Sequence, residues 1–185
     1  MTIDADEVVV GASGTILVAP VGTAIPTEIS AAFDPAWIDL GAVNEDGVSW
    51  SDGKSTSDVN AWQSFYPLRK LIDSRTGVIG FELIQWNRAT VGLAFGGGTF
   101  SEPSVGEFKY VPPAPSVLDE RMLAVEWADG SKNYRLIFAR GIVADSVETG
   151  LSRSTESGLP ISFELLGSDS GDPWEFHTDD PAFAP

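Results

Sequence analysis

The sequence contains no cysteine, so it can form neither a disulfide framework nor a thiolate metal site. It contains one histidine, His177, on which any Ser-His-Asp site or histidine-rich metal site would have to depend. No run of about 18 apolar residues is present, which excludes a transmembrane helix. The acidic start, MTIDADEVVVG, lacks the basic region of a signal peptide. We therefore expect a protein made and used in a reducing cytoplasm and not secreted.

Basic residues are missing from both ends of the chain, whose net charge is −16. Residues 1–53 hold nine Asp or Glu and no Lys or Arg, and residues 141–185 hold nine acidic residues and a single cation, Arg153. The middle, residues 54–140, is balanced, with ten basic and nine acidic residues. This distribution disfavours tight electrostatic binding to nucleic acid, because phosphate backbones are themselves anionic. It is equally consistent with a charge that serves only solubility.

The remaining residue types do not form a catalytic or metal-binding motif. Carboxylate-only calcium turns are conceivable at residues 44–47 and 169–172, but neither has the spacing of an EF-hand loop. The run Gly96–Gly98 follows a predicted helix, whereas a phosphate-binding loop precedes one. Acidic residues are frequent, yet nothing selects a catalytic pair. We therefore predict no enzymatic activity, no cofactor and no metal site.

Short β-branched and aromatic runs separated by Gly, Pro and Asn predict a mainly β protein. Asp129-Gly130 is a strong signal for a tight hairpin turn, and Gly141 is predicted to break the returning strand. One helix is predicted after Asn87, a candidate N-cap. We predict a β-sandwich or partial barrel with one flanking helix. The expected strands are 15–19, 37–43, 48–52, 68–74, 77–86, 107–111, 121–128, 133–140, 142–148 and 159–165.

Three further segments complete the predicted organisation. An N-terminal arm covers residues 1–13, the β-sandwich domain covers 14–166, and an acidic C-terminal arm covers 167–185. Within the domain, residues 53–66 are predicted to form an extended loop that carries Trp62, Phe65 and Tyr66. A loop of that length is uncommon unless it is functional or disordered, and these aromatic side chains need burial against the chain's own core or against a neighbouring chain. The six tryptophans are typical of core or interface anchors, although a sugar-binding platform would also use them.

Several short motifs, in order, carry a resemblance that covers roughly residues 12–166. The chain resembles the major tail protein, or tail tube subunit, of long-tailed phages that infect actinobacteria. The motifs are Gly14-Thr-Ile-Leu-Val-Ala-Pro20 with Gly22-Thr23 and Pro26-Thr27, Ala36-Trp37-Ile-Asp-Leu-Gly41, Glu45-Asp46-Gly47-Val48, Ala61-Trp62-Gln63 with Pro67-Leu68-Arg69, Phe81-Glu-Leu-Ile-Gln-Trp-Asn87, Phe95-Gly-Gly-Gly98 and Leu159-Pro-Ile-Ser-Phe163.

The resemblance implies a small β-sandwich with one helix across its outside, which forms hexameric rings by joining inner sheets into a barrel. The rings stack into a hollow tube around a tape-measure protein, and DNA later passes through the tube without sticking to an acidic wall. Tail terminator and tail-tip proteins are the implied partners, the virion tail is the implied location, and no membrane is involved.

By the same resemblance, the loop 53–66 reaches the adjacent ring, and both terminal arms are unpaired in the single chain. The candidate interface residues are Trp62, Phe65, Tyr66, Arg69, Trp174 and Phe176. Two alternatives remain open at this point: a tail terminator or neck protein of the same fold, and a carbohydrate-binding adhesion module.

Overall fold

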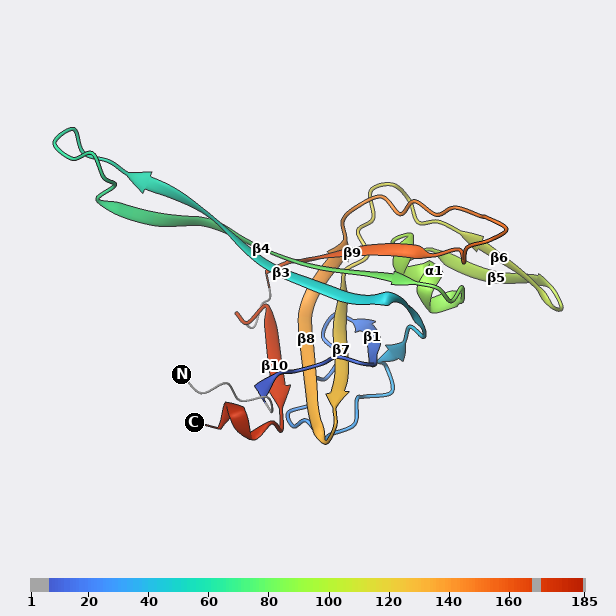
Figure 1. The fold of residues 1–185 in the computed structure, drawn as a ribbon. Helices are drawn as coiled ribbons and strands as arrows, with labels where there is room; N and C mark the ends of the chain where they lie inside the picture. The colour runs from blue at the N-terminus through green and yellow to red at the C-terminus, as the bar shows by residue number, and fades with distance from the viewer. Residues whose placement is uncertain (1–6, 168–170, 185) are drawn as a thin grey trace.

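The computed structural model describes residues 7–167 and 171–184, and it is mainly β, as predicted (Figure 1). Its elements are β1 (Gly14–Pro20), β2 (Ile38–Asp39), β3 (Val43–Val59), β4 (Arg69–Leu83), α1 (Arg88–Ala94), β5 (Thr99–Ser104), β6 (Glu107–Val111), β7 (Arg121–Asp129), β8 (Lys132–Val143), β9 (Leu159–Leu165), β10 (Trp174–Thr178) and a 3-10 turn at Pro181–Phe183. Within the described residues, no helix is both long and apolar enough to span a bilayer.

The main sheet is antiparallel and forms two layers, and strand β8 takes part in both of them. Its strand order is β2-β1-β7-β8-β9-β4-β3, and β10 pairs separately with β8. The first part of β8 pairs with β10 at residues 134–138, whereas its last part pairs with β9 at residues 141–143. One layer is therefore β2-β1-β7-β8-β10, and the other is β8-β9-β4-β3, which lies across it (Figure 1).

The core lies between these two layers and follows the alternation of the strands. Alternate residues of β4 and β9 point inward, and they meet inward residues of β1, β7 and β8. Phe138 and Phe163 are the largest apolar side chains at the centre of this cluster and are fully buried. The other members are Ile16, Val18, Leu40, Ile79, Phe81, Leu83, Leu93, Ala94, Leu123, Val125, Leu136, Leu159 and Ile161.

A second, smaller cluster covers the outer face of β1, β7 and β8 with the segment that follows β1. Trp37 is buried there and donates its indole N–H to the carbonyl of Ala24. Arg135, only 3% exposed, anchors the same segment by donating to the carbonyls of Glu28 and Ala31, 3.0 Å away in both cases. Its guanidinium also bonds the Glu126 carboxylate, so the buried charge is paired.

The prediction that Gly141 breaks the strand is wrong, because β8 continues through it to Val143. A Cβ atom at this position would overlap the ring of Phe163 and would lie 2.6 Å from the Glu164 carbonyl oxygen. The glycine therefore lets β8 approach β9 closely at the point where the strand passes from one layer to the other.

The predicted helix is confirmed, but its expected position is corrected. Asn87 caps it by accepting from the N–H groups of Ala89 and Thr90, while the Thr90 hydroxyl accepts from the Asn87 N–H, which completes a capping box. Leu93 and Ala94 belong to the main core cluster. The helix therefore closes one end of the space between the layers instead of lying across the outside of the sandwich.

Several strand boundaries also differ from the prediction. The expected strand 37–43 is reduced to β2, because Trp37 turns into the outer cluster. The two expected strands 68–74 and 77–86 are one continuous strand, β4, and residues 53–59 of the expected loop belong to β3. Cross-strand pairing along the whole of β3 and β4 decides these boundaries, and it overrides the low strand propensity of Ser, Asp and Gly.

Candidate assembly surfaces

The most conspicuous feature is a two-stranded hairpin that leaves the body of the protein. β4 pairs with β9 only over residues 78–83, so beyond Asp52 and Gly77 the hairpin has no other strand beside it. Residues 54–75, which we call the hairpin arm, project away from the sandwich (Figure 1). Eight residues of antiparallel strand, 52–59, span roughly 26 Å. A projection of that length cannot fold its end back onto its own core.

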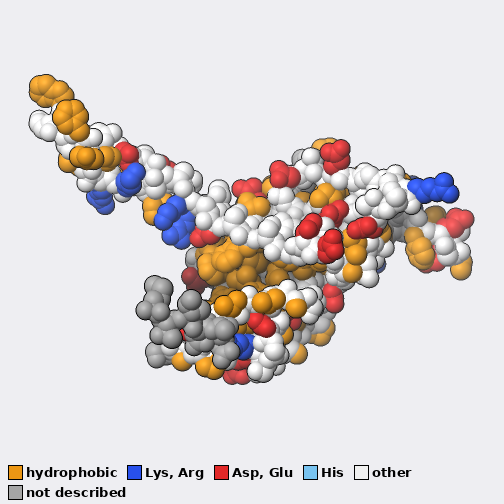
Figure 2. Space-filling model, in the orientation of Figure 1, with side chains coloured by type: hydrophobic (Ala, Val, Ile, Leu, Met, Phe, Trp, Pro, Cys, Tyr) orange, Lys and Arg blue, Asp and Glu red, His pale blue; other side chains and the backbone are white. Residues whose placement is uncertain are grey.

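The end of the hairpin arm, residues 60–68, is an ordered turn that presents large apolar side chains. Leu68 N–H donates to the Val59 carbonyl at 2.8 Å, and the Ser64 hydroxyl donates to the Tyr66 carbonyl at 2.8 Å. Trp62, Phe65 and Tyr66 are 97%, 106% and 81% exposed, and the rings stand clear of the rest of the molecule (Figure 2). Three exposed aromatic residues on a fixed turn are typical of a binding surface.

The hairpin arm is also the most basic part of the chain. It contains four of the 11 Lys and Arg residues and only two of the 27 acidic ones, Asp58 and Asp73. Lys70 pairs with Asp58 at 2.7 Å, whereas Lys54, Arg69 and Arg75 make no salt bridge with any described residue. The predicted interface residue Arg69 opens β4 directly below the tip and is exposed. A cationic arm on a strongly acidic protein has a complementary partner in another copy of the same chain.

The sheet that carries the arm has a free edge. Along all of its length, β3 pairs with β4 and with no other described strand, so one row of its backbone N–H and C=O groups is open. An open edge of this length invites a further strand from another chain.

Outside the hairpin arm, the β3-β4-β9 layer carries no cations. The hydroxyls of Ser49 and Ser51 bond the carbonyls of Gly80 and Val78 within the sheet. Residues 43–53, 76–83 and 159–165 contain five acidic residues and no Lys or Arg. Such a face offers a phosphate backbone no cation with which to form a salt bridge.

The two layers are open along one side, where apolar side chains reach the surface between them (Figure 2). We call this opening the sandwich mouth. It has a volume of about 310 Å³ and borders the edge strand β3 through Val48 and Trp50. Trp50 packs edge-on against Phe138 and Trp174, with ring centroids 6.2 and 4.7 Å away.

The C-terminal segment is paired within the chain, so the expectation that it is unpaired is wrong for residues 174–178. β10 forms a ladder with β8, and it carries the candidate interface residues Trp174 and Phe176. Trp174 contacts Trp50, and Phe176 packs beside Trp127 and Tyr134. Both aromatic residues stabilise the strand on its own sheet, and the Phe176 ring is still partly exposed.

Two carboxylates fasten the end of β10. Asp179 accepts from the backbone and side-chain amides of Asn133, and these bonds lower its pKa. Asp180 accepts from the Ala182 N–H, from the Tyr134 hydroxyl and from Lys132, which lowers the Asp180 pKa as well. Desolvation, with the bond to Asp180 as the second cause, raises the pKa of Tyr134 to about 12.

A second hairpin, β5–β6, stands at the end of the molecule opposite the hairpin arm (Figure 1). The Tyr110 hydroxyl donates to the Gly97 carbonyl at 2.9 Å, and its ring packs against Phe100 at 4.8 Å, so the hairpin is tied to the end of α1. Gly98 has φ +97°, and a Cβ there would lie 2.6 Å from the Val111 carbonyl oxygen. The glycines after the helix are therefore a fixed turn.

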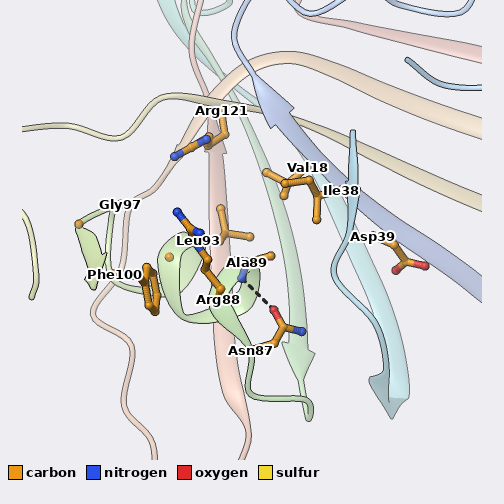
Figure 3. Close-up of a pocket in the computed structure, with 12 residues that line it drawn as sticks. Val18, Ile38, Asp39, Asn87, Arg88, Ala89, Leu93, Gly97, Phe100 and Arg121 are labelled. Carbon is orange, nitrogen blue, oxygen red and sulfur yellow. Dashed lines mark hydrogen bonds between the residues drawn. The ribbon is translucent and has the colours of Figure 1, made fainter. Parts of the chain in front are cut away.

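Two hollows flank the side chains of Arg88 and Phe100 beneath this second hairpin. One, of about 570 Å³, lies between α1 and β1, with Arg88 and Arg121 facing each other across it (Figure 3). The other, also about 570 Å³, is lined by Trp86, Phe100 and Phe108. We call these three residues the aromatic shelf; Phe108 is 80% exposed, and Trp86 is fixed by its indole bond to the Ser157 carbonyl.

The residues considered for catalysis do not form a site in the described part of the chain. His177 contacts Glu175 at 3.0 Å on the surface strand β10. No group of three or more His, Asp or Glu residues with metal-binding geometry occurs among the described residues. The turn 44–47 belongs to the irregular start of β3, and residues 169 and 170 of the other candidate turn lie outside the described residues.

The aromatic shelf was not anticipated from the sequence. Trp86 seemed to end a strand, and Phe100 and Phe108 lie in a Gly- and Pro-rich stretch where only a short extended piece, 107–111, was expected. The sequence signal that could have indicated this second hairpin is a pair of aromatic residues, Phe100 and Tyr110, on either side of a turn. The two residues are cross-strand partners on β5 and β6.

A β-sandwich with a projecting aromatic arm and a free sheet edge has the surfaces of a structural subunit that contacts further chains. The family model described as "Phage tail tube protein" matches residues 1–185, and the chain belongs to this family. No curated protein matches the chain. Family membership makes this protein a structural component of a phage tail, and it implies self-assembly into a tube. The range of phage hosts implied by the resemblance is not part of this finding.

Proposed function

We propose that this protein forms hexameric rings that stack into a hollow tail tube, assembled around a tape-measure protein and used for DNA passage. The observation that carries the proposal is the hairpin arm, which holds Trp62, Phe65 and Tyr66 away from any surface of their own chain. Exposure of large apolar side chains to water is unfavourable, and contact with a second copy of the chain would remove them from water. We propose these residues, with Arg69, as contacts between rings.

The ring itself is proposed to close through sheet edges. The free edge of β3 supplies one side of such a joint, and a head-to-tail contact repeated around an axis closes into a ring. Closure removes the open edges that a single copy presents. Trp174 and Phe176 are proposed to contribute from β10, whose outer edge is also open among the described residues.

The lack of cations on the β3-β4-β9 layer outside the hairpin arm supports the role in DNA passage. If this face lines the tube, DNA meets serine hydroxyls already bonded to the sheet, and acidic residues such as Glu82 and Glu164. Repulsion from these carboxylates is confined by salt to a layer of about 8–10 Å, which leaves the DNA free to slide. Synthesis in the host cytoplasm, and the tail terminator and tail-tip proteins as partners at the tube ends, are part of the same proposal.

The alternatives are less well supported. Family membership favours the tube over a terminator or neck role. A sugar-binding platform needs several exposed tryptophans side by side, whereas Trp37 is buried and Trp50, Trp127 and Trp174 pack against other rings.

Electron microscopy of the purified protein over a concentration series tests the proposal. We expect hollow tubes or six-fold rings from the natural chain, with the tape-measure and tail-tip proteins added if assembly needs an initiator. A variant in which residues 55–74 are replaced by Asn-Gly keeps the Lys54–Arg75 pair and closes it with a favourable two-residue turn. It should remain folded and form no tubes. Normal tubes from this variant would contradict the role of the arm.

A further inference from the structure

We infer that the tip of the hairpin arm docks on the aromatic shelf of a second copy, with Trp62, Phe65 and Tyr66 in the two hollows beside Arg88. This inference rests on the proposed function and names the receiving surface for the arm, which neither the family nor the sequence assigns.

The first argument is the placement of the two surfaces. The arm tip and the second hairpin lie at opposite ends of the molecule (Figure 1), and hydrophobic side chains lie beside charged side chains of both signs at the end away from the arm (Figure 2). The tip of the arm therefore cannot reach the second hairpin of its own chain. A donor at one end and an acceptor at the other make a head-to-tail contact that repeats from copy to copy.

The second argument is the shape and chemistry of the acceptor. Each hollow has a volume of about 570 Å³, which lies within the range of sites that hold an aromatic group. The Arg88 guanidinium lies 5.6 Å from the Phe100 ring centre and makes no salt bridge with a described residue. A planar cation between two hollows is a favourable partner for the faces of incoming aromatic rings.

The third argument is charge. Arg69 and Lys70 lie just below the tip, and Glu102 and Glu107 lie on the second hairpin. Glu102 lines the shelf hollow, and its carboxylate accepts only a backbone N–H, that of Gly106, among the described contacts. The acceptor side also carries the cations Arg88 and Lys109, so Glu102 and Glu107 are the groups there with which Arg69 and Lys70 of the tip can pair.

The sandwich mouth is the competing acceptor, and it is less suitable. Its lining includes Val48 and Trp50 of the edge strand β3, so a strand from the neighbouring copy in a ring would cover it. No residue of the aromatic shelf lines the sandwich mouth, so a strand that covers Val48 and Trp50 does not by itself cover the shelf.

Cysteine crosslinking tests the inference directly, because the natural chain has no cysteine. One variant carries Gln63→Cys at the tip, a second carries Ser101→Cys in the shelf hollow, and a control carries Val48→Cys in the mouth. Pairs of variants are mixed, assembled, treated with a short bismaleimide and separated on a denaturing gel. We expect a crosslinked dimer from the tip and shelf variants mixed together, and none from the tip and mouth variants.

A second measurement compares Phe108→Ser with Val105→Ser, a matched control on the same hairpin that is fully exposed and lines neither hollow. Phe108→Ser should raise the concentration needed for assembly at least tenfold, and Val105→Ser should leave it unchanged. Tubes without a tip–shelf crosslink, or a crosslink to the mouth instead, would overturn the inference and leave the proposed tube intact. A tip–shelf crosslink without tubes or rings would support the contact and contradict the tube.

Discussion

Substitutions at the arm tip should leave the folding of the single chain unchanged and should weaken its assembly. In the triple variant W62S/F65S/Y66S, each replaced side chain is already almost fully exposed in the single chain. Surface substitutions of this kind change the free energy of unfolding by no more than about 0.5 kcal/mol. The thermal midpoint of the dispersed subunit should therefore match that of the natural chain.

Assembly should respond very differently. Burying one large apolar side chain contributes about 1.5–3 kcal/mol, so three such contacts per subunit supply several kcal/mol. Interface contributions are not additive, and we take about 4 kcal/mol as a conservative loss. Since about 1.4 kcal/mol changes an equilibrium constant tenfold, the contact between copies should weaken by about a thousandfold.

Sedimentation of assembled material over a concentration series measures this loss. The natural chain should pellet above a threshold concentration, and the triple variant should stay in the supernatant at concentrations far above it. Q63S, at the same tip but with no aromatic ring, is the matched control and should assemble normally. Tubes from the triple variant at the natural threshold would refute the reasoning, as would a large fall in its thermal midpoint.

Three further predictions concern the fold. Arg135→Met removes the partner of Glu126 and the donors to two carbonyls, and it should lower the free energy of unfolding by about 2–3 kcal/mol in a denaturant titration; an unchanged midpoint would contradict the anchoring role. Gly141→Ala forces β8 away from Phe163 and should cost about 1–3 kcal/mol, whereas Gly150→Ala, with open space around its Cβ, should be neutral; equal effects would refute the close-approach argument. Because the pKa of Asp180 is lowered on folding, the stability that it contributes is present at neutral pH and is lost as pH falls below about 4 through its folded-state value. The fluorescence of Trp174 should report release of β10 in that pH range. Asp180→Asn should already weaken the pairing of β10 at pH 7. If the pH-dependent fluorescence change persists unchanged in this variant, the Asp180 carboxylate is not its cause.

The local features that could be predicted are those in which neighbouring residues determine the conformation. The predicted β7–β8 turn occurs one residue later than expected, at Gly130 and Ser131 between the paired residues Asp129 and Lys132, and Gly130 has φ +61°. Asn87 with Thr90 determined the start of the helix, because capping acts over a few neighbouring residues. The alternation in residues 121–128 and 159–165 determined which side chains enter the core. The aromatic residues at 62, 65 and 66 could be identified from the sequence as side chains in need of burial, but their pattern left open whether the chain's own core or a neighbouring chain would bury them.

Other features depended on strands brought together from distant parts of the chain. Residues 53–59 have low strand propensity and became strand because β4 supplies a full ladder of partners. Gly141 continues β8 because Phe163, distant in sequence, needs the space, and residues 174–178 form β10 because the edge of β8 was available to pair with them.

The sequence by itself determined a mainly β, acidic subunit with one capped helix and an aromatic segment in need of a partner. Only the tertiary structure decided that this segment stands on a projecting hairpin, opposite an aromatic shelf formed by Trp86, Phe100 and Phe108. The reason is physical: propensity, turns and charge act along the chain, whereas sheet edges and hollows arise only when distant strands pack.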